Sequence, residues 1–336
     1  MRYLITGHTG FKGAWLAAIL KAQGHEILGI SLPPQRKSLY GSAQLSDYYQ
    51  NEFFIDIRDR ELLNRTLSKL EFDAAIHLAA QPLVRESYRS PIETFETNVM
   101  GTLNLLEAYR EHENKPLVVV TTDKVYKNKN QKLGYLEEDE LGGHDPYSAS
   151  KAAADIATQS WLSSFNCKNI SIARAGNVIG GGDWGVDRLI PDLVAAFESG
   201  KPATIRYPNA IRPWQHVADC LSGYLLLSNG MMRDKIAGVW NFGPEINPEN
   251  SVRKVADLAC AYWGLGASWE IKDGEHAHET GPLLLDSSKA RESLGWADKL
   301  EFDQAIAWTI DFYKANSRGD NPRILLETQV NQFLAL

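Results

Sequence analysis

The sequence predicts an α/β protein with a Rossmann-type doubly wound parallel sheet and a smaller C-terminal lobe that binds the substrate. Three observations predict this class. Short apolar runs of β type alternate with longer helical patterns, a glycine-rich turn directly follows the first run, and the alternation loosens beyond Gly176.

The alternation gives each element of the sheet domain an expected place in the chain. Strands are expected at 3–6, 26–31, 53–56, 74–78, 117–121 and 169–175. Helices are expected at 11–22, between 56 and 70, at 91–110 and at 147–165. Because parallel strands need crossover connections, helices between successive strands indicate a parallel sheet.

The C-terminal part shows looser signals. Helices are expected around 189–199, from the N-cap Ser251 to 262, and over 287–294, where Gly295 ends the helix. Residues 1–175 are predicted to form the dinucleotide-binding domain, with a return segment near 213–245, and residues 176–336 the substrate lobe. No low-complexity linker separates the two, so we expect them to pack together.

Composition and charge narrow the function classes. The chain has 336 residues, 44% hydrophobic and 23% charged, and can bury a large core. A formal net charge of -7 disfavours nucleic acids and anionic membranes as partners. The cysteines Cys167, Cys220 and Cys260 form no CxxC motif, so neither disulfides nor a metal site are expected. No run suits a signal peptide or a membrane span, so we expect a cytoplasmic protein.

The glycine-rich turn is the first candidate site. Thr6-Gly7-His8-Thr9-Gly10-Phe11-Lys12-Gly13 lies between the first strand and the first helix. Glycines there allow a tight turn and let a pyrophosphate approach the N–H groups of a helix N-terminus. An ordinary turn is the alternative. The predicted cofactor-binding residues of this turn are Gly7, Thr9, Gly10, Phe11 and Gly13.

The carboxyl ends of the second and third strands say less about the cofactor. A ribose-binding acidic residue is expected about 20 positions after the glycines, but the sequence reads Gly29-Ile30-Ser31-Leu32. Arg36 and Lys37 follow and could meet a 2′-phosphate, so this position leaves NAD and NADP both open. Asp56 and Ile57 are predicted to bind the edge of the adenine ring. Equally, Asp56 could cap the helix that follows.

The second candidate site is catalytic. Tyr147 and Lys151 lie on one helix face, where an ammonium beside a phenol would lower the phenol's pKa from about 10. Thr122, Asp123 and Lys124 end the fifth strand, where open α/β sheets place ligand chemistry. The alternative is a plain turn in which Asp123 caps and Lys124 is solvated.

Together these motifs resemble the extended short-chain dehydrogenase/reductase family, the NAD-dependent epimerases and dehydratases, over essentially the whole chain. Asn98 in Thr97-Asn98-Val99-Met100-Gly101-Thr102 adds to the likeness. Within the family, the chain is similar to sugar-nucleotide 4,6-dehydratases. Its Asp123-Lys124 resembles the members that act on CDP-glucose, whereas most others carry Asp-Glu. The matching segments are 7–13, 79–85, 122–124, 145–148, 174–184 and 211–217.

The resemblance implies a reaction and its residues. A nucleoside diphosphate glucose would lose water to give a 4-keto-6-deoxy sugar through tightly bound NAD. Tyr147, with Thr122 and Lys151, would remove the O4 proton. Lys124 would take the C5 proton while protonated Asp123 donates to the leaving C6 hydroxyl. An epimerase or reductase would not need this second pair, and a non-catalytic dinucleotide sensor of the same fold would be expected to lack Tyr147 and Lys151.

The resemblance also implies binding residues and a partner. The further cofactor-binding residues are Ala79, Ala80 and Asn98, beside Tyr147 and Lys151. The substrate-binding residues are Arg85, Asn177, Arg188, Arg212 and Glu279. Arg212 could instead pair with Asp219, and Glu279 could be a solvated loop carboxylate. His216 is expected to be a packed core residue. Helices 91–110 and 147–165 would form a four-helix homodimer interface.

Two departures from the family lie in or near the substrate lobe. The stretch between Phe165 and Asn169 is short, and His278-Glu279-Thr280 replaces a His-Glu-Ala pattern. They leave the nucleotide base and the sugar less defined than the type of reaction.

Overall fold

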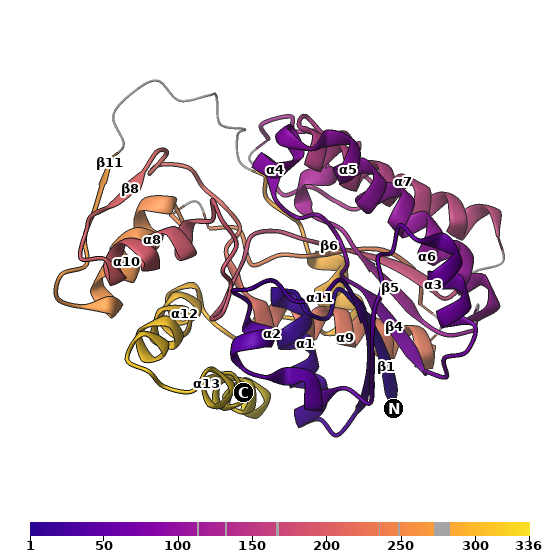
Figure 1. The fold of residues 1–336 in the computed structure, drawn as a ribbon. Helices are drawn as coiled ribbons and strands as arrows, with labels where there is room; N and C mark the ends of the chain where they lie inside the picture. Colours follow the sequence, from indigo (N-terminus) through magenta and orange to yellow (C-terminus); the bar gives the residue numbers. More distant parts are fainter. Residues whose placement is uncertain (113, 132, 166–167, 235, 248, 272–282) are drawn as a thin grey trace.

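A parallel sheet of seven strands forms the centre of the protein, in the order β10-β6-β5-β4-β1-β2-β3 (Figure 1). The computed structural model describes residues 1–336 except 113, 132, 166–167, 235, 248 and 272–282. All neighbouring strands of this sheet pair in parallel. The Rossmann-type class is therefore confirmed. The strands are β1 (Arg2–Thr6), β2 (Glu26–Ser31), β3 (Asn51–Phe54), β4 (Ala74–His77), β5 (Leu117–Val120), β6 (Ile170–Ala175) and β10 (Gly238–Phe242).

Helices cover both faces of the sheet. On one face lie α3 (Arg60–Leu67), α6 (Gly101–Tyr109) and α7 (Pro146–Ser164), and on the other α1 (Phe11–Ala22) and α9 (Val217–Asp234). Because successive side chains of a strand point to opposite faces, Leu4 joins one core while Tyr3 and Ile5 join the other. Both faces of β1 are thus buried, as expected of a central parallel strand.

The predicted helix over 91–110 is interrupted. The chain forms α5 (Pro91–Phe95), a π-helical turn (Glu96–Met100) and then α6, after a short helix α4 (Val84–Arg89) that the sequence analysis did not expect. Such π-helical turns are rare and frequently mark functional positions. Asn98 lies in the middle of this turn and is buried.

The second lobe lies beside the carboxyl ends of the strands (Figure 1). Its strands β8 (Ala203–Ile205) and β11 (Trp269–Ile271) pair in parallel, as do β7 (Val178–Ile179) and β9 (Gln215–His216). After β9 the chain returns through α9 and β10 to the edge of the main sheet. The boundary at residue 175 stays a prediction. The remaining helices are α2 (Leu39–Ser42), α8 (Leu189–Glu198), α10 (Val252–Trp263), α11 (Ser288–Leu294), α12 (Phe302–Ser317) and α13 (Pro322–Ala335).

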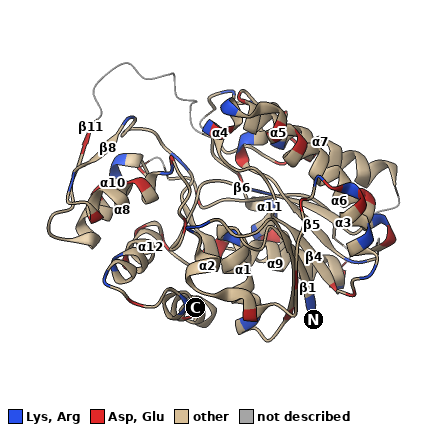
Figure 2. Ribbon diagram, viewed as in Figure 1, with Lys and Arg blue, Asp and Glu red and all other residues tan. Residues whose placement is uncertain are grey.

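Charged residues of both signs are interspersed along the same helices (Figure 2). Many form surface pairs, such as Arg2 with Glu26 and Arg323 with Asp47. Within the described residues, no helix combines the length and the apolar character that crossing a bilayer requires.

Candidate active site

The glycine-rich turn is sterically closed to other residues. Gly7 has a φ of +76°, and a Cβ there would lie 2.6 Å from the Ala79 nitrogen. A Cβ at Gly13 would lie 2.3 Å from the Gly7 carbonyl oxygen. Gly10 precedes α1 and offers no side-chain cap. The first N–H groups of α1 are therefore not capped by a side chain, as an anion site at a helix N-terminus requires.

The side chains of Thr9 and Lys37 both make contacts near the end of β2. The Thr9 hydroxyl lies 2.8 Å from the Ser31 hydroxyl and donates to the Leu32 carbonyl oxygen at 3.1 Å. The Lys37 ammonium lies 3.9 Å from the ring centre of Trp184, in the second lobe. This cation–π contact links the segment after β2 to the lobe.

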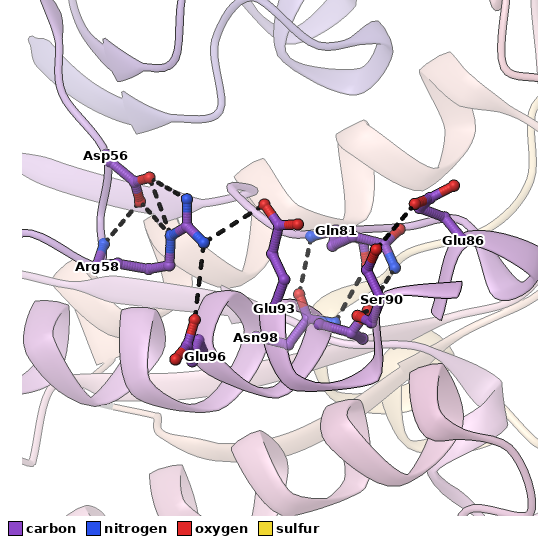
Figure 3. Close-up of polar contacts among 9 residues, drawn as sticks. Asp56, Arg58, Gln81, Glu86, Ser90, Glu93, Glu96 and Asn98 are labelled. Carbon is purple, nitrogen blue, oxygen red and sulfur yellow. Dashed lines mark hydrogen bonds and ion pairs between the residues drawn. The ribbon is translucent and has the colours of Figure 1, made fainter. Parts of the chain in front are cut away.

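Asp56 pairs with its neighbour and does not cap the next helix. Its carboxylate accepts bonds from both the backbone N–H and the guanidinium of Arg58, with Nη2 at 2.6 Å (Figure 3). Arg58 also reaches Glu93 and Glu96. Asp59 caps α3 instead, accepting from the Leu62 N–H at 3.0 Å. The capping alternative for Asp56 is therefore wrong. The neighbouring Ile57 side chain is buried in the core.

Asn98 bridges the loop after β4 to α7. Its amide oxygen accepts from the Gln81 N–H at 2.8 Å, and its nitrogen donates to the Gln81 carbonyl at 3.1 Å (Figure 3). The same nitrogen donates to the Ser150 hydroxyl at 2.9 Å. Asn98 thus holds Ala79 and Ala80, which precede Gln81, close to the helix that carries Tyr147. A direct contact with a cofactor stays a prediction.

Thr122, Asp123 and Lys124 form a compact turn at the end of β5. The Thr122 hydroxyl donates to Asp123 Oδ1 at 2.8 Å and accepts from the Lys124 N–H at 3.4 Å. Thr122, not Asp123, therefore caps this turn. The Asp123 side chain is buried, and burial raises its pKa despite the charges of Lys124 and Arg212 and the Thr122 hydrogen bond. A raised pKa favours the protonated acid.

Tyr147 is the second residue of α7, after the N-cap Asp145 and Pro146, and is close to the turn. Burial raises the pKa of Tyr147 to about 12, the Asp123 charge adds to the rise, and a hydrogen bond with Thr122 opposes it. The net lowering of the Tyr147 pKa that the sequence predicted is therefore wrong for this structure, because burial outweighs the nearby positive charges. The Lys151 ammonium donates to the Val120 carbonyl at 2.8 Å, and burial lowers its pKa to about 8.

Two arginines of the second lobe act electrostatically on Tyr147 and Asp123. The Arg188 charge opposes the rise in the pKa of Tyr147, and the Arg212 charge opposes the rise in the pKa of Asp123. Arg188 also pairs with Asp183 at 2.6 Å. The alternative pairing of Arg212 with Asp219 is wrong, because one Asp219 oxygen accepts from the Lys299 N–H at 2.7 Å and the other has no hydrogen-bond partner among the described residues.

The other predicted substrate residues lie farther out. Arg85, on α4, pairs with Asp187 in the loop before α8, so it links the two lobes. Asn177 precedes β7, and its carbonyl accepts from the Gln215 N–H at 3.0 Å. Glu279 lies outside the described residues. In the described part of the chain, no three His, Cys, Asp or Glu residues are grouped as a metal ion would need.

Three residues that lie around the site were given no role from the sequence. Lys12 follows the glycine turn, and its ammonium donates to the Tyr224 hydroxyl at 3.0 Å. Arg174 and Asp155 form a buried ion pair near the turn Thr122–Lys124 that follows β5. Lys12 and Arg174 carried a signal, since they lie in the matching segments 7–13 and 174–184, whereas Asp155 carried none. His216 is buried between Trp15 and Trp308, which confirms a core role.

The sheet, the glycine turn and the Tyr147/Lys151 helix define the class of extended short-chain dehydrogenases/reductases. Within it, the chain belongs to the family described as GDP-mannose 4,6 dehydratase, whose family model matches residues 4–309.

Relatives share this architecture over almost their whole length. CDP-glucose 4,6-dehydratase from Salmonella typhimurium is 39% identical, over 99% of this chain and 96% of its own. UDP-glucose 4-epimerase from Lactobacillus helveticus is 26% identical over 95% of this chain and 99% of its own. The solved dTDP-glucose 4,6-dehydratase from Streptomyces venezuelae, with NAD and TYD bound, has a TM-score of 0.81 at 25% identity, covering 95% and 98% of the chains.

Proposed function

We propose that the protein is an NAD-dependent lyase that converts CDP-D-glucose to CDP-4-dehydro-6-deoxy-D-glucose and water. The observation that carries the proposal is the Asp123-Lys124 pair beside Tyr147, because only the elimination of water needs a second acid–base pair. The 39% identity to a CDP-glucose 4,6-dehydratase supports both the reaction and the base.

The glycine turn fits a dinucleotide. NAD held there would supply reversible hydride transfer between C4 and C6 of the sugar. Main-chain N–H groups of Thr9 and Phe11 at the start of α1 would hold its pyrophosphate. The Gly10 N–H donates to the Gly7 carbonyl oxygen at 3.1 Å and shapes the turn, and Gly7 and Gly13 allow its close backbone packing, because a Cβ at either would strike the backbone of Ala79 or Gly7. The remaining cofactor residues of the proposal are Asp56, Ile57, Ala79, Ala80, Asn98, Tyr147 and Lys151.

The first proton transfer is assigned to Tyr147, which would accept the proton of the C4 hydroxyl. Because burial raises its pKa to about 12, the phenol needs positive charge nearby to act as a base. Arg188 already lowers this pKa. Lys151, four residues after Tyr147 on the same helix face, is the second positive charge proposed to act on the phenol.

The elimination is assigned to the turn after β5. Once C4 is a ketone, the C5 proton becomes acidic; Lys124 removes it and returns a proton to C5 when C6 accepts the hydride. Asp123 donates a proton to the C6 hydroxyl, which leaves as water, and its raised pKa favours the protonated form that this step requires. The Thr122 hydroxyl, bonded to Asp123, fixes the orientation of that carboxyl group.

The diphosphate of the substrate is assigned to the cationic side of the second lobe. Arg188 and Arg212 supply guanidinium groups beside the catalytic turn, and such groups match phosphate oxygens well. Asn177, Arg85 and Glu279 complete the proposed substrate set.

A panel of CDP-, UDP-, GDP- and dTDP-glucose, followed by mass spectrometry, tests the function. We expect loss of water from CDP-glucose at the highest rate. Conversion without loss of mass would favour a 4-epimerase, the activity named for the Lactobacillus helveticus relative.

We further propose a cytoplasmic homodimer that serves deoxysugar synthesis for cell-surface polysaccharide. Large apolar side chains are exposed on α4, α5, the π-helical turn and α7, where a four-helix interface would bury them. They are Tyr88, Ile92, Phe95, Met100 and Ile156. Light scattering should give twice the mass of one chain; a single-chain mass at micromolar concentration would overturn the dimer.

A further inference from the structure

Arg174 and Asn241 are register partners on β6 and β10, the strands that form one edge of the main sheet. Both side chains are completely buried, each at 0% exposure. A buried guanidinium and a buried amide are costly unless they are fully hydrogen-bonded, so their partners indicate what they hold in place.

Arg174 joins α7 to the catalytic strand end. Its guanidinium forms two bonds to the Asp155 carboxylate, at 2.9 and 2.8 Å. Asp155 lies one helical turn after Lys151 and also accepts from the Thr121 hydroxyl at 2.9 Å. Since Thr121 directly precedes Thr122, the ion pair fixes the helix that carries Tyr147 relative to the turn.

The same guanidinium holds the chain that leaves the turn. Its Nη1 donates to the Tyr126 hydroxyl at 2.8 Å and to the Glu137 carbonyl at 2.9 Å. Tyr126 comes two residues after Lys124. Its ring also lies 4.8 Å from the guanidinium carbon and is stacked on Tyr135, with centroids 5.1 Å apart.

Asn241 ties this chain to the second lobe. Its amide oxygen accepts from the Tyr126 hydroxyl at 2.8 Å, and its amide nitrogen donates to the carbonyls of Tyr135 and Asp286, at 2.8 and 3.0 Å. Its backbone N–H donates to Glu137 Oε1 at 2.9 Å. Asp286 leads from the substrate lobe into α11. The single amide therefore contacts two segments distant from it in sequence, one with Tyr126 and Tyr135 and one with Asp286.

We propose that Arg174 and Asn241 are positioning residues for the elimination step, acting on Asp123 and Lys124 through the Tyr126 hydroxyl. This inference rests on the proposed function. Elimination needs Asp123 and Lys124 to reach the C6 hydroxyl and the C5 proton together, so it depends on the placement of the whole turn. Removal of the O4 proton depends on Tyr147 of α7, which Arg174 holds through Asp155 and not through the Tyr126 hydroxyl.

The test uses Tyr126→Phe, because replacing Arg174 would leave Asp155 as an unpaired buried charge and endanger folding. The variant keeps the ring and removes only the hydroxyl shared by Arg174 and Asn241. We expect the rate of water loss to fall by up to about 10²-fold, since small misplacements of reacting groups have effects of that size. Oxidation at C4 should fall much less, so reduced nicotinamide should accumulate during turnover of CDP-glucose.

Tyr109→Phe is the matched control. Tyr109 is also buried, and its hydroxyl donates to the Pro116 carbonyl at 2.9 Å, away from the catalytic turn. Accumulation of reduced nicotinamide in Tyr126→Phe but not in Tyr109→Phe supports the inference. Equal ratios of the two half-reactions in both variants overturn it. If the wild-type protein dehydrates no sugar nucleotide, the proposed function itself fails, which is a separate result.

Discussion

Asp123 and Asp56 both follow the carboxyl end of a strand in the same sheet, yet their surroundings differ. Asp123 is 2% exposed, and burial raises its pKa. The Asp56 side chain is 29% exposed, and hydrogen bonds from Arg58 lower its pKa. One carboxyl group is suited to donate a proton, and the other to remain an anion. The comparison shows that position at a strand end does not determine acid–base character; burial and the nearest partner do.

The strongest test of this comparison is Asp123→Asn. The amide keeps the shape but cannot donate the proton to the C6 hydroxyl, so water loss should slow by about 10² to 10⁴. Oxidation at C4 should survive, and absorbance of reduced nicotinamide should build up on addition of CDP-glucose. Wild-type turnover in this variant, or loss of C4 oxidation as complete as in Tyr147→Phe, would contradict the assignment.

Lys151→Met should have the next largest effect. It removes a buried ammonium from the helix face that carries Tyr147, so the phenol loses nearby positive charge. The activity–pH profile should move to higher pH, and the protein should retain NAD less well after gel filtration. Full activity with an unchanged profile would mean that Lys151 only supports the Val120 carbonyl.

Asp219→Asn tests whether burial alone raises a carboxyl pKa outside the site. Burial raises the pKa of Asp219 from 3.8 to about 7, and the nearby Asp298 charge adds to the rise. The folded protein therefore binds the proton more tightly, so stability should fall as pH rises through this window. Thermal unfolding between pH 4 and pH 8 should show a flatter decline in the variant, whose amide oxygen can still accept from the Lys299 N–H. Parallel curves for the two proteins would refute the raised pKa.

Asp56→Asn should have the smallest effect. The Asp56–Arg58 pair is partly solvated, so its loss should lower the free energy of unfolding by less than about 1 kcal/mol. Urea titration at neutral pH measures this change. A larger loss would show that the partly exposed Asp56–Arg58 pair is important for stability. The contrast between an exposed Asp56 and a buried Asp123 would then no longer hold.

The sequence alone determined the sheet, because its signals are local. The predicted bounds of β2 and α1 agree with the structure, since period, capping and glycine position lie within a few residues of each element. The sequence also correctly placed Thr122, Asp123 and Lys124 just after the fifth strand, β5. The π-helical turn at Asn98 was missed, because it depends on contacts with Gln81 and Ser150 in other elements.

Only the tertiary structure determined the pKa values of the catalytic side chains and the contacts that hold the turn after β5 in place. Pattern suggested that Lys151 would lower the pKa of Tyr147, but burial raises it, and the Lys151 ammonium contacts Val120. Arg174 and Asn241 are distant in sequence from Tyr126, the residue that they contact just after the turn, and they meet it because β6 pairs with β5 and β10 pairs with β6. Burial and long-range hydrogen bonds follow from the packing of the whole chain, and no local pattern encodes them.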